Sequence, residues 1–164
     1  MARAGQPSDG DERAITLGWL AFHRDALAAK GDGLSDAQLV ERAGAPSKLS
    51  LLGLIRHLTE MERAYGTWAL GPKSDLEWVY GVYDDDGPEW DMDCDASMVG
   101  DSMHKWESEK CSNDRLVARY ALGDVGTGNG HTLRWNLQKL VGEYARHNGH
   151  ADILREGIDG QTGE

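Results

Sequence analysis

Apolar residues recur at helical spacing in four long segments of this chain, and that pattern restricts the fold more than any other feature. The segments run from about Asp11 to Lys30, from Ser50 to Leu70, from about Ala96 to Tyr120 and from about Leu133 to Glu156. Strict alternation of apolar and polar residues, the mark of a half-buried strand, is scarce. Helices with one apolar stripe bury it against one another, so we predict an all-α fold: an antiparallel four-helix bundle in a single domain.

Local signals support these boundaries. Ser35 and Gln38 have the spacing of a capping box and predict a further short helix. Gly71 and the proline after it end the second long segment. Residues 1–10 are polar and predict a disordered lead, so the domain is expected to span residues 11–164.

Charge and composition exclude several classes of partner. The chain has 164 residues, with 17 basic and 28 acidic side chains and a net charge of -11. Such a surface repels phosphate backbones and anionic lipids, so we expect neither a nucleic-acid nor a membrane partner. No apolar run approaches the roughly 20 residues of a membrane span, and no signal peptide is evident, which favours a cytoplasmic protein. Cys94 and Cys111 form no CxxC pair and are interpreted as reduced thiols.

The last segment places three polar side chains beside its apolar stripe. With Leu140 at zero on a helical wheel, His147 falls at about -20°, Glu143 at about -60° and His150 at about -80°. The stripe itself consists of Leu133, Leu137, Leu140, Tyr144, Ala151, Leu154 and Ile158. Glu143, His147 and His150 therefore line one edge of the buried face.

The second segment offers a fourth metal-competent side chain. With Leu54 at zero, Leu58, Met61, Tyr65 and Trp68 stay within roughly 40°, and His57 falls at about -60°. If the two helices are neighbours, His57 can meet His147 and His150. Burying such groups without a partner costs several kcal/mol, which a divalent cation would offset. Three protein ligands plus an open position are typical of a catalytic zinc site. The alternative is that these are satisfied core histidines. His23, His104 and His131 fit no such cluster, and we interpret them as surface or packing residues.

Three further patterns in the sequence are less specific. "DMDCD" (91–95) resembles the start of a calcium loop but lacks its later ligands, which excludes an EF-hand. "GTGNG" (126–130) indicates a flexible turn and no phosphate cradle. The connection from Gly71 to Asp95 carries Trp78, Tyr80, Tyr83 and Trp90, which either form a wall or lid over the site or cap the end of the bundle.

The segments "SLLGLIRHLTEMER", "LRWNLQKLVGEYARHNGHADILRE" and "IDGQTGE" resemble the DinB/YfiT-like metalloprotein superfamily, and in particular its actinobacterial branch with the mycothiol S-transferases. The resemblance implies a four-helix bundle that binds a divalent metal, commonly zinc or nickel. The first histidine ligand of the family matches His57, and the remaining ligands come from the last helix. There the family pattern falls on Glu143 and His147, and this branch also carries the histidine at position 150.

The resemblance leaves Glu143 and His150 as alternatives for the third ligand. We favour His57, His147 and His150, with Glu143 as a nearby proton acceptor, because imidazole suits zinc. The implied function is transfer of a low-molecular-weight thiol such as mycothiol to a small electrophilic substrate, which the sequence does not identify. A metal-dependent isomerase or hydrolase and a non-catalytic metal- or small-molecule-binding protein are the alternatives. Homodimers are common among such bundles, but this is an analogy between folds, so the sequence leaves the oligomeric state open.

Overall fold

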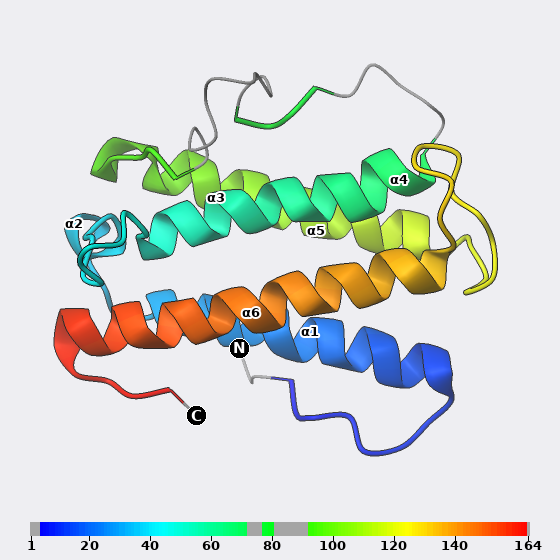
Figure 1. Cartoon of the computed structure of the whole chain (residues 1–164), viewed down its shortest axis with the longest axis horizontal. Helices are drawn as coiled ribbons and strands as arrows, with labels where there is room; N and C mark the ends of the chain where they lie inside the picture. The colour runs from blue at the N-terminus through cyan, green and yellow to red at the C-terminus, as the bar shows by residue number, and fades with distance from the viewer. Residues whose placement is uncertain (1–3, 72–76, 81–91, 164) are drawn as a thin grey trace.

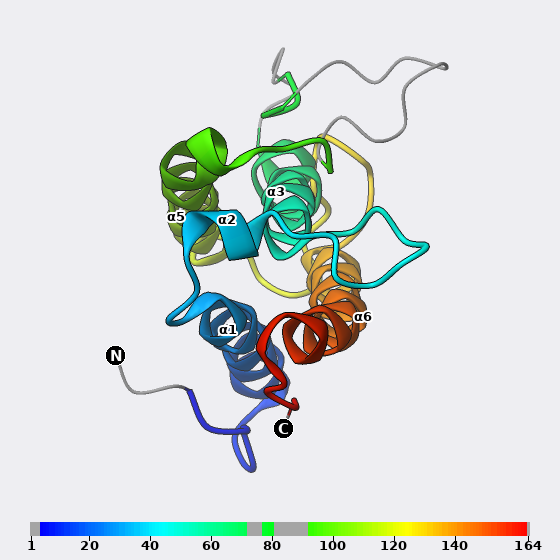
Figure 2. The same cartoon turned by 90° about the vertical axis from the view of Figure 1, so that its left-hand side faces the viewer.

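A computed structural model describes residues 4–71, 77–80 and 92–163. Its helices are α1 (Glu12–Gly31), α2 (Asp36–Leu39), α3 (Leu51–Glu62), the π-helical η1 (Arg63–Thr67), α4 (Trp68–Leu70), the 3-10 turn η2 (Ala96–Met98), α5 (Val99–Val117) and α6 (Leu133–Asp159). The described residues contain no strand, only an isolated bridge between Val125 and Thr132. Figure 1 shows the long helices side by side, and Figure 2 shows them end-on at the four corners of a bundle. The predicted all-α four-helix fold is confirmed.

Three of the long helices begin at residues whose side chains cap them. The side chains of Asp11, Ser50 and Thr132 each accept a hydrogen bond from a backbone N–H in the first turn of α1, α3 and α6. Ser35 and Gln38 form the predicted capping box at the start of α2. Of the predicted disordered lead, residues 1–3 lie outside the described residues, and the backbone N–H of Ala4 donates to Asp25 of α1.

The prediction that the bundle is antiparallel throughout is wrong. Arg56 contacts Ser102 near the start of α5, whereas Glu62 contacts Asn113 near its end, so α3 and α5 run in the same direction. Glu12 pairs with Arg134 and His23 contacts Asn148, so α1 and α6 are also parallel. In Figure 1 the colour gradient runs in the same direction along α3 and α5, and likewise along α1 and α6. A connection as long as residues 71–95 can return the chain to the end where α3 began, and neighbouring helices are then parallel.

The second long segment departs from its predicted stripe in its C-terminal half. Positions 51–56 and 58–60 of α3 are all buried, because α5 and α6 cover this helix from two sides. Beyond Glu62 only one face stays buried, that of Gly66, Ala69 and Leu70. Met61 and Tyr65 are half-buried and Trp68 is 41% exposed. The side chains predicted to continue the core instead line the outer seam between this helix and α6.

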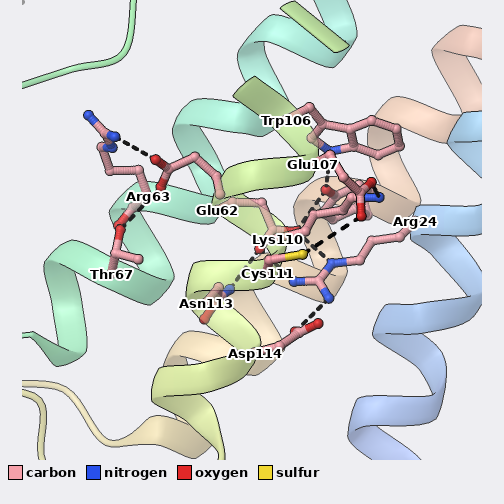
Figure 3. A network of polar contacts seen from close by, with 12 residues as sticks. Arg24, Glu62, Arg63, Thr67, Trp106, Glu107, Lys110, Cys111, Asn113 and Asp114 are labelled. Carbon is pink, nitrogen blue, oxygen red and sulfur yellow. Dashed lines mark hydrogen bonds and ion pairs between the residues drawn. The ribbon is translucent and has the colours of Figure 1, made fainter. Parts of the chain in front are cut away.

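A buried polar network joins the four long helices (Figure 3). The Glu62 carboxylate is fully buried and accepts four hydrogen bonds of 2.6–2.8 Å. Two come from the guanidinium of Arg24 on α1, one from Asn113 on α5 and one from the hydroxyl of Tyr144 on α6. The indole N–H of Trp106 then donates to that hydroxyl at 2.8 Å. Each helix thus contributes a group to a single buried anion.

Close packing around Glu62 explains a glycine in the π-helical turn. A Cβ at Gly66 would lie 2.3 Å from the side chain of Asn113. Glycine therefore lets Asn113 reach the carboxylate. Burial alone would lower the pKa of Arg24, but the adjacent carboxylate more than offsets this, so the pKa lies above its ordinary value. Burial, followed by the charge of Glu62, raises the pKa of Tyr144 well above its usual range.

The glycine-rich stretch before α6 packs against the end of α4. The backbone N–H of Gly128 donates to the carbonyl of Ala69 at 3.0 Å. A Cβ at Gly128 would lie 1.9 Å from the carbonyl oxygen of Trp68. These glycines are therefore required for close approach of two backbones, a reason the sequence did not reveal.

None of the helices within residues 4–71, 77–80 and 92–163 combines the length and apolar composition of a membrane span.

Replacing Arg24 with leucine should destabilise the fold by about 3–5 kcal/mol, because it leaves a buried carboxylate without its cation. The double variant Arg24→Leu/Glu62→Leu should be less destabilised than Arg24→Leu, since no buried charge remains. Urea unfolding followed by circular dichroism measures both. Arg134→Ala, which removes the exposed partner of Glu12, is the matched control and should leave the midpoint nearly unchanged. Equal destabilisation by Arg24→Leu and by the control would contradict this role of the network.

Candidate metal centre

The histidines of the second and last long segments meet across the α3–α6 seam. His57 of α3 and His147 of α6 have ring centroids 4.6 Å apart with planes inclined at 62°. The two helices run antiparallel and side by side (Figure 1). Both rings are half-buried, His147 with 12% of its side chain exposed. The seam thus presents two imidazoles to a shared point.

Glu143, one turn before His147, completes a cluster of three donors. One ligand atom from each of His57, Glu143 and His147 lies within 4.8 Å of the others. The Oε2 atom of Glu143 is 3.6 Å from Nε2 of His147, and only 12% of the carboxylate side chain is exposed. The structure therefore brings together three of the four side chains singled out in the sequence.

His150 is close to the cluster but contacts a different edge of His147. Its Nδ1 atom is 3.3 Å from Nδ1 of His147, while Nε2 of His147 is the nitrogen that faces Glu143. The two nitrogens of an imidazole point in different directions, so a group bound to one of them is poorly placed to share an ion held by the other. His150 is placed to fix the tautomer of His147.

The electrostatics of the site favour a neutral His147. Burial, together with the neighbouring His57 and His150, lowers the pKa of His147 to about 4, although the Glu143 carboxylate opposes this. The ring is therefore uncharged near pH 7 and its contact with Glu143 is not an ion pair. A neutral imidazole keeps the lone pair that a metal requires.

Lys139 is a residue of the site that the sequence analysis missed. Its ammonium lies 3.3 Å from Oε1 of Glu143, one turn before it on α6. Its Nζ also lies 5.6 Å from the ring centroid of Tyr65 on η1. The i, i+4 spacing to Glu143 was the available signal.

The donor set fits a divalent cation. Zinc–nitrogen and zinc–oxygen bonds of about 2.0–2.2 Å place two tetrahedral donors roughly 3.4 Å apart. The donor atoms here need to close by little more than an ångström from their separation of up to 4.8 Å, a change within the reach of side-chain rotation. Two imidazoles and a carboxylate form a ligand set that zinc uses in catalytic sites.

The aromatic residues of the long connection divide between two places. Trp78 lines a groove with Tyr65, Trp68 and Trp135 along the α3–α6 seam. The guanidinium carbon of Arg56 lies over the ring of Tyr80, 3.9 Å from its centroid. Tyr83 and Trp90 lie outside the described residues.

Two of the histidines interpreted as surface or packing residues lie elsewhere. His104 is exposed on α5, whereas the ring of His131 stacks on Trp135 with their centroids 3.9 Å apart.

The pKa of His147 predicts how stability depends on pH in the metal-free protein. An unfolded histidine titrates near pH 6.5, so between pH 6.5 and 4 the unfolded chain binds a proton that the folded chain does not. Stability should be intact above pH 6.5 and fall by about 2 kcal/mol between pH 7 and pH 5 through this group.

Urea unfolding with a chelator at pH 7 and pH 5 measures that loss, and His147→Gln should reduce it. The same loss in the wild type and in His147→Gln would show that another group is responsible. His104→Gln, which alters an exposed histidine of α5, is the control.

Comparison with known proteins assigns the chain to a family. The model of the family described as Mycothiol-S-transferase matches residues 16–160, a span that includes the α3 histidine and the whole cluster on α6. No curated protein and no solved structure matches the chain. The match extends over well more than half of the sequence and confirms the predicted resemblance. The chain belongs to the mycothiol-S-transferase family.

Proposed function

We propose that this protein is a divalent-metal-dependent S-transferase that joins mycothiol, or a similar low-molecular-weight thiol, to a small electrophile. The observation that supports it best is the convergence of His57, Glu143 and His147 from two helices on one point. The family match supports the thiol as co-substrate. Zinc is the proposed ion because two imidazoles and a carboxylate suit it, and nickel accepts the same donors.

We assign the inner ligands to His57, Glu143 and His147, and give His150 a supporting role. The contact between the Nδ1 atoms of His150 and His147 leaves Nε2 of His147 directed toward Glu143. This assignment differs from the set preferred on sequence grounds, in which His150 replaced Glu143. It rests on which edge of the His147 ring each neighbour contacts.

A bound cation would supply the Lewis acidity that makes a thiol give up its proton at neutral pH. The chain prepares the site for this chemistry in three ways. His147 stays neutral, His150 holds its ring in place, and Glu143 offers a carboxylate whose other oxygen is held by Lys139. With Glu143 assigned as a ligand and its other oxygen paired with Lys139, the proton of the thiol is released to water. The sulfur then forms a bond to the electrophilic carbon, and that carbon releases its leaving group.

Metal analysis of purified variants tests the ligand assignment. After dialysis against zinc, wild-type protein should hold stoichiometric metal, whereas His57→Ala, His147→Ala and Glu143→Ala should lose it. His150→Ala should keep zinc with affinity reduced by about 10- to 100-fold, as expected when a supporting hydrogen bond to a ligand is removed. Full zinc in Glu143→Ala together with none in His150→Ala would favour the alternative set.

A transfer assay with mycothiol and a bimane-type electrophile tests the activity. Turnover should require bound zinc, disappear in His147→Ala with the fold intact, and persist in His104→Ala, which changes an exposed histidine of α5. Tight zinc binding without turnover of any thiol would contradict the enzyme and support a binding protein.

A further inference from the structure

An aromatic groove lies between η1 and the start of α6. It encloses about 440 Å³, within the range of about 300–1,000 Å³ that is typical of small-molecule sites. Two of its tryptophans, Trp68 and Trp135, are 41% and 39% exposed, although tryptophan is usually more deeply buried. The described lining consists of Met61, Ala64, Tyr65, Trp68, Trp78, Asn129, His131 and Trp135. The groove therefore presents large ring faces to a molecule that enters it.

The lining of the aromatic groove favours an uncharged, flat ligand. No carboxylate, ammonium or guanidinium lines the groove among the described residues, so a charged molecule would lose its water without gaining a counter-charge. Aromatic faces also attract cations, but the ammonium of Lys139 already lies 5.6 Å from the ring centroid of Tyr65 and repels a second cation. Flat aromatic molecules stack on rings such as those of Trp68 and Trp135. An uncharged aromatic molecule is thus the ligand class that this lining suits best.

One wall of the groove belongs to a short segment, residues 77–80, of the connection between α4 and η2. Trp78 of this segment lines the groove and also a second cavity of about 140 Å³, which it shares with Arg63, Trp68 and Glu77. A side chain that borders two cavities is held less by close packing than by its backbone. The position of Trp78 therefore depends on how residues 77–80 are attached to the bundle.

Charged side chains of α3 and η1 attach both ends of this segment. The guanidinium of Arg63 donates to the carbonyl of Glu77 at 2.7 Å. The side chain of Glu60, a residue only 1% exposed, accepts a hydrogen bond from the backbone N–H of Tyr80 at 2.8 Å. The guanidinium carbon of Arg56 lies 3.9 Å from the centroid of the Tyr80 ring. In the low-dielectric interior a hydrogen bond is stronger than one exposed to water, so Glu60 is a firm attachment point.

We propose that the aromatic groove is a binding site for an uncharged, flat aromatic molecule, and that Glu60 and Tyr80 are positioning residues that hold Trp78 as one of its walls. Neither the cation nor a thiol enters this argument, so the inference goes beyond the proposed function and does not depend on it. Because Met61 lines the groove one turn after His57, one end of the groove lies beside the histidine cluster.

Fluorescence titration with prodan, an uncharged naphthalene dye that brightens in apolar surroundings, tests the ligand class. The dye should bind the full-length protein, and Trp135→Ala, with circular dichroism to verify the fold, should weaken binding about tenfold through lost ring contacts. Naphthol should displace the dye, whereas naphthalene sulfonate and phenyltrimethylammonium should not. Ile153→Ala, which removes an exposed apolar side chain elsewhere on α6, should leave the affinity unchanged. Unchanged affinity in Trp135→Ala, or displacement by either ion as readily as by naphthol, would overturn the ligand class.

A double-mutant cycle with the same dye tests the two positioning residues. Trp78→Ala, Tyr80→Ala and Glu60→Leu should each weaken dye binding about three- to tenfold. Glu60→Gln keeps a side-chain carbonyl that accepts the N–H of Tyr80, so it should retain most of the affinity. In the Trp78→Ala background neither Tyr80→Ala nor Glu60→Leu should weaken binding further, because both act through the tryptophan.

Tyr80→Ala changes only the attached segment, so it carries the cycle even if Glu60→Leu does not fold. Additive losses in the Trp78→Ala background, or unchanged affinity in Tyr80→Ala with the fold intact, would overturn the positioning role. Dye binding that requires Trp78 and Trp135 in the presence of a chelator would support the groove whether or not the protein transfers a thiol.

Discussion

The buried carboxylate of Glu62 is the interaction on which the rest of the structure depends. It receives hydrogen bonds from α1, α5 and α6, so it determines how all of them are placed against α3. Its bond to Tyr144 fixes the rotation of α6, and Tyr144 stands directly after Glu143. With Tyr144 directed into the core, Glu143 and His147 are directed along the seam toward His57. A buried charge is a costly way to stabilise a bundle, and here it specifies one arrangement of helices.

Local features of the fold could be predicted from sequence because they depend on local chemistry. The stripe of α6 through Leu137, Leu140 and Tyr144 is buried as predicted, and the capping serines mark real helix starts. The direction of α5 could not be predicted, because a connection as long as residues 71–95 permits either. The burial of Glu62 could not be predicted, since nothing in the sequence indicates which donors will surround a carboxylate after folding.

The candidate site shows the same division between local and tertiary information. The helical wheel predicted that His57 and His147 could meet, and they lie ring to ring. It could not separate Glu143 from His150, which share a flank of α6, because the distinction depends on which edge of the His147 ring each one contacts. Met61, Tyr65 and Trp68 were predicted to be core because their stripe is apolar. Beyond Glu62 this stripe lies along a groove that Trp78 and Trp135 also line, so its side chains are only partly buried.

The proposed chemistry requires that imidazoles from α3 and α6 hold one cation with room for a sulfur atom. X-ray absorption spectroscopy of the zinc-loaded protein tests it most directly. We expect a shell of nitrogen and oxygen at about 2.0–2.2 Å with the multiple scattering of two imidazoles, and one sulfur at about 2.3 Å once mycothiol is added. A shell without imidazole scattering, or one that gains no sulfur from the thiol, would contradict it.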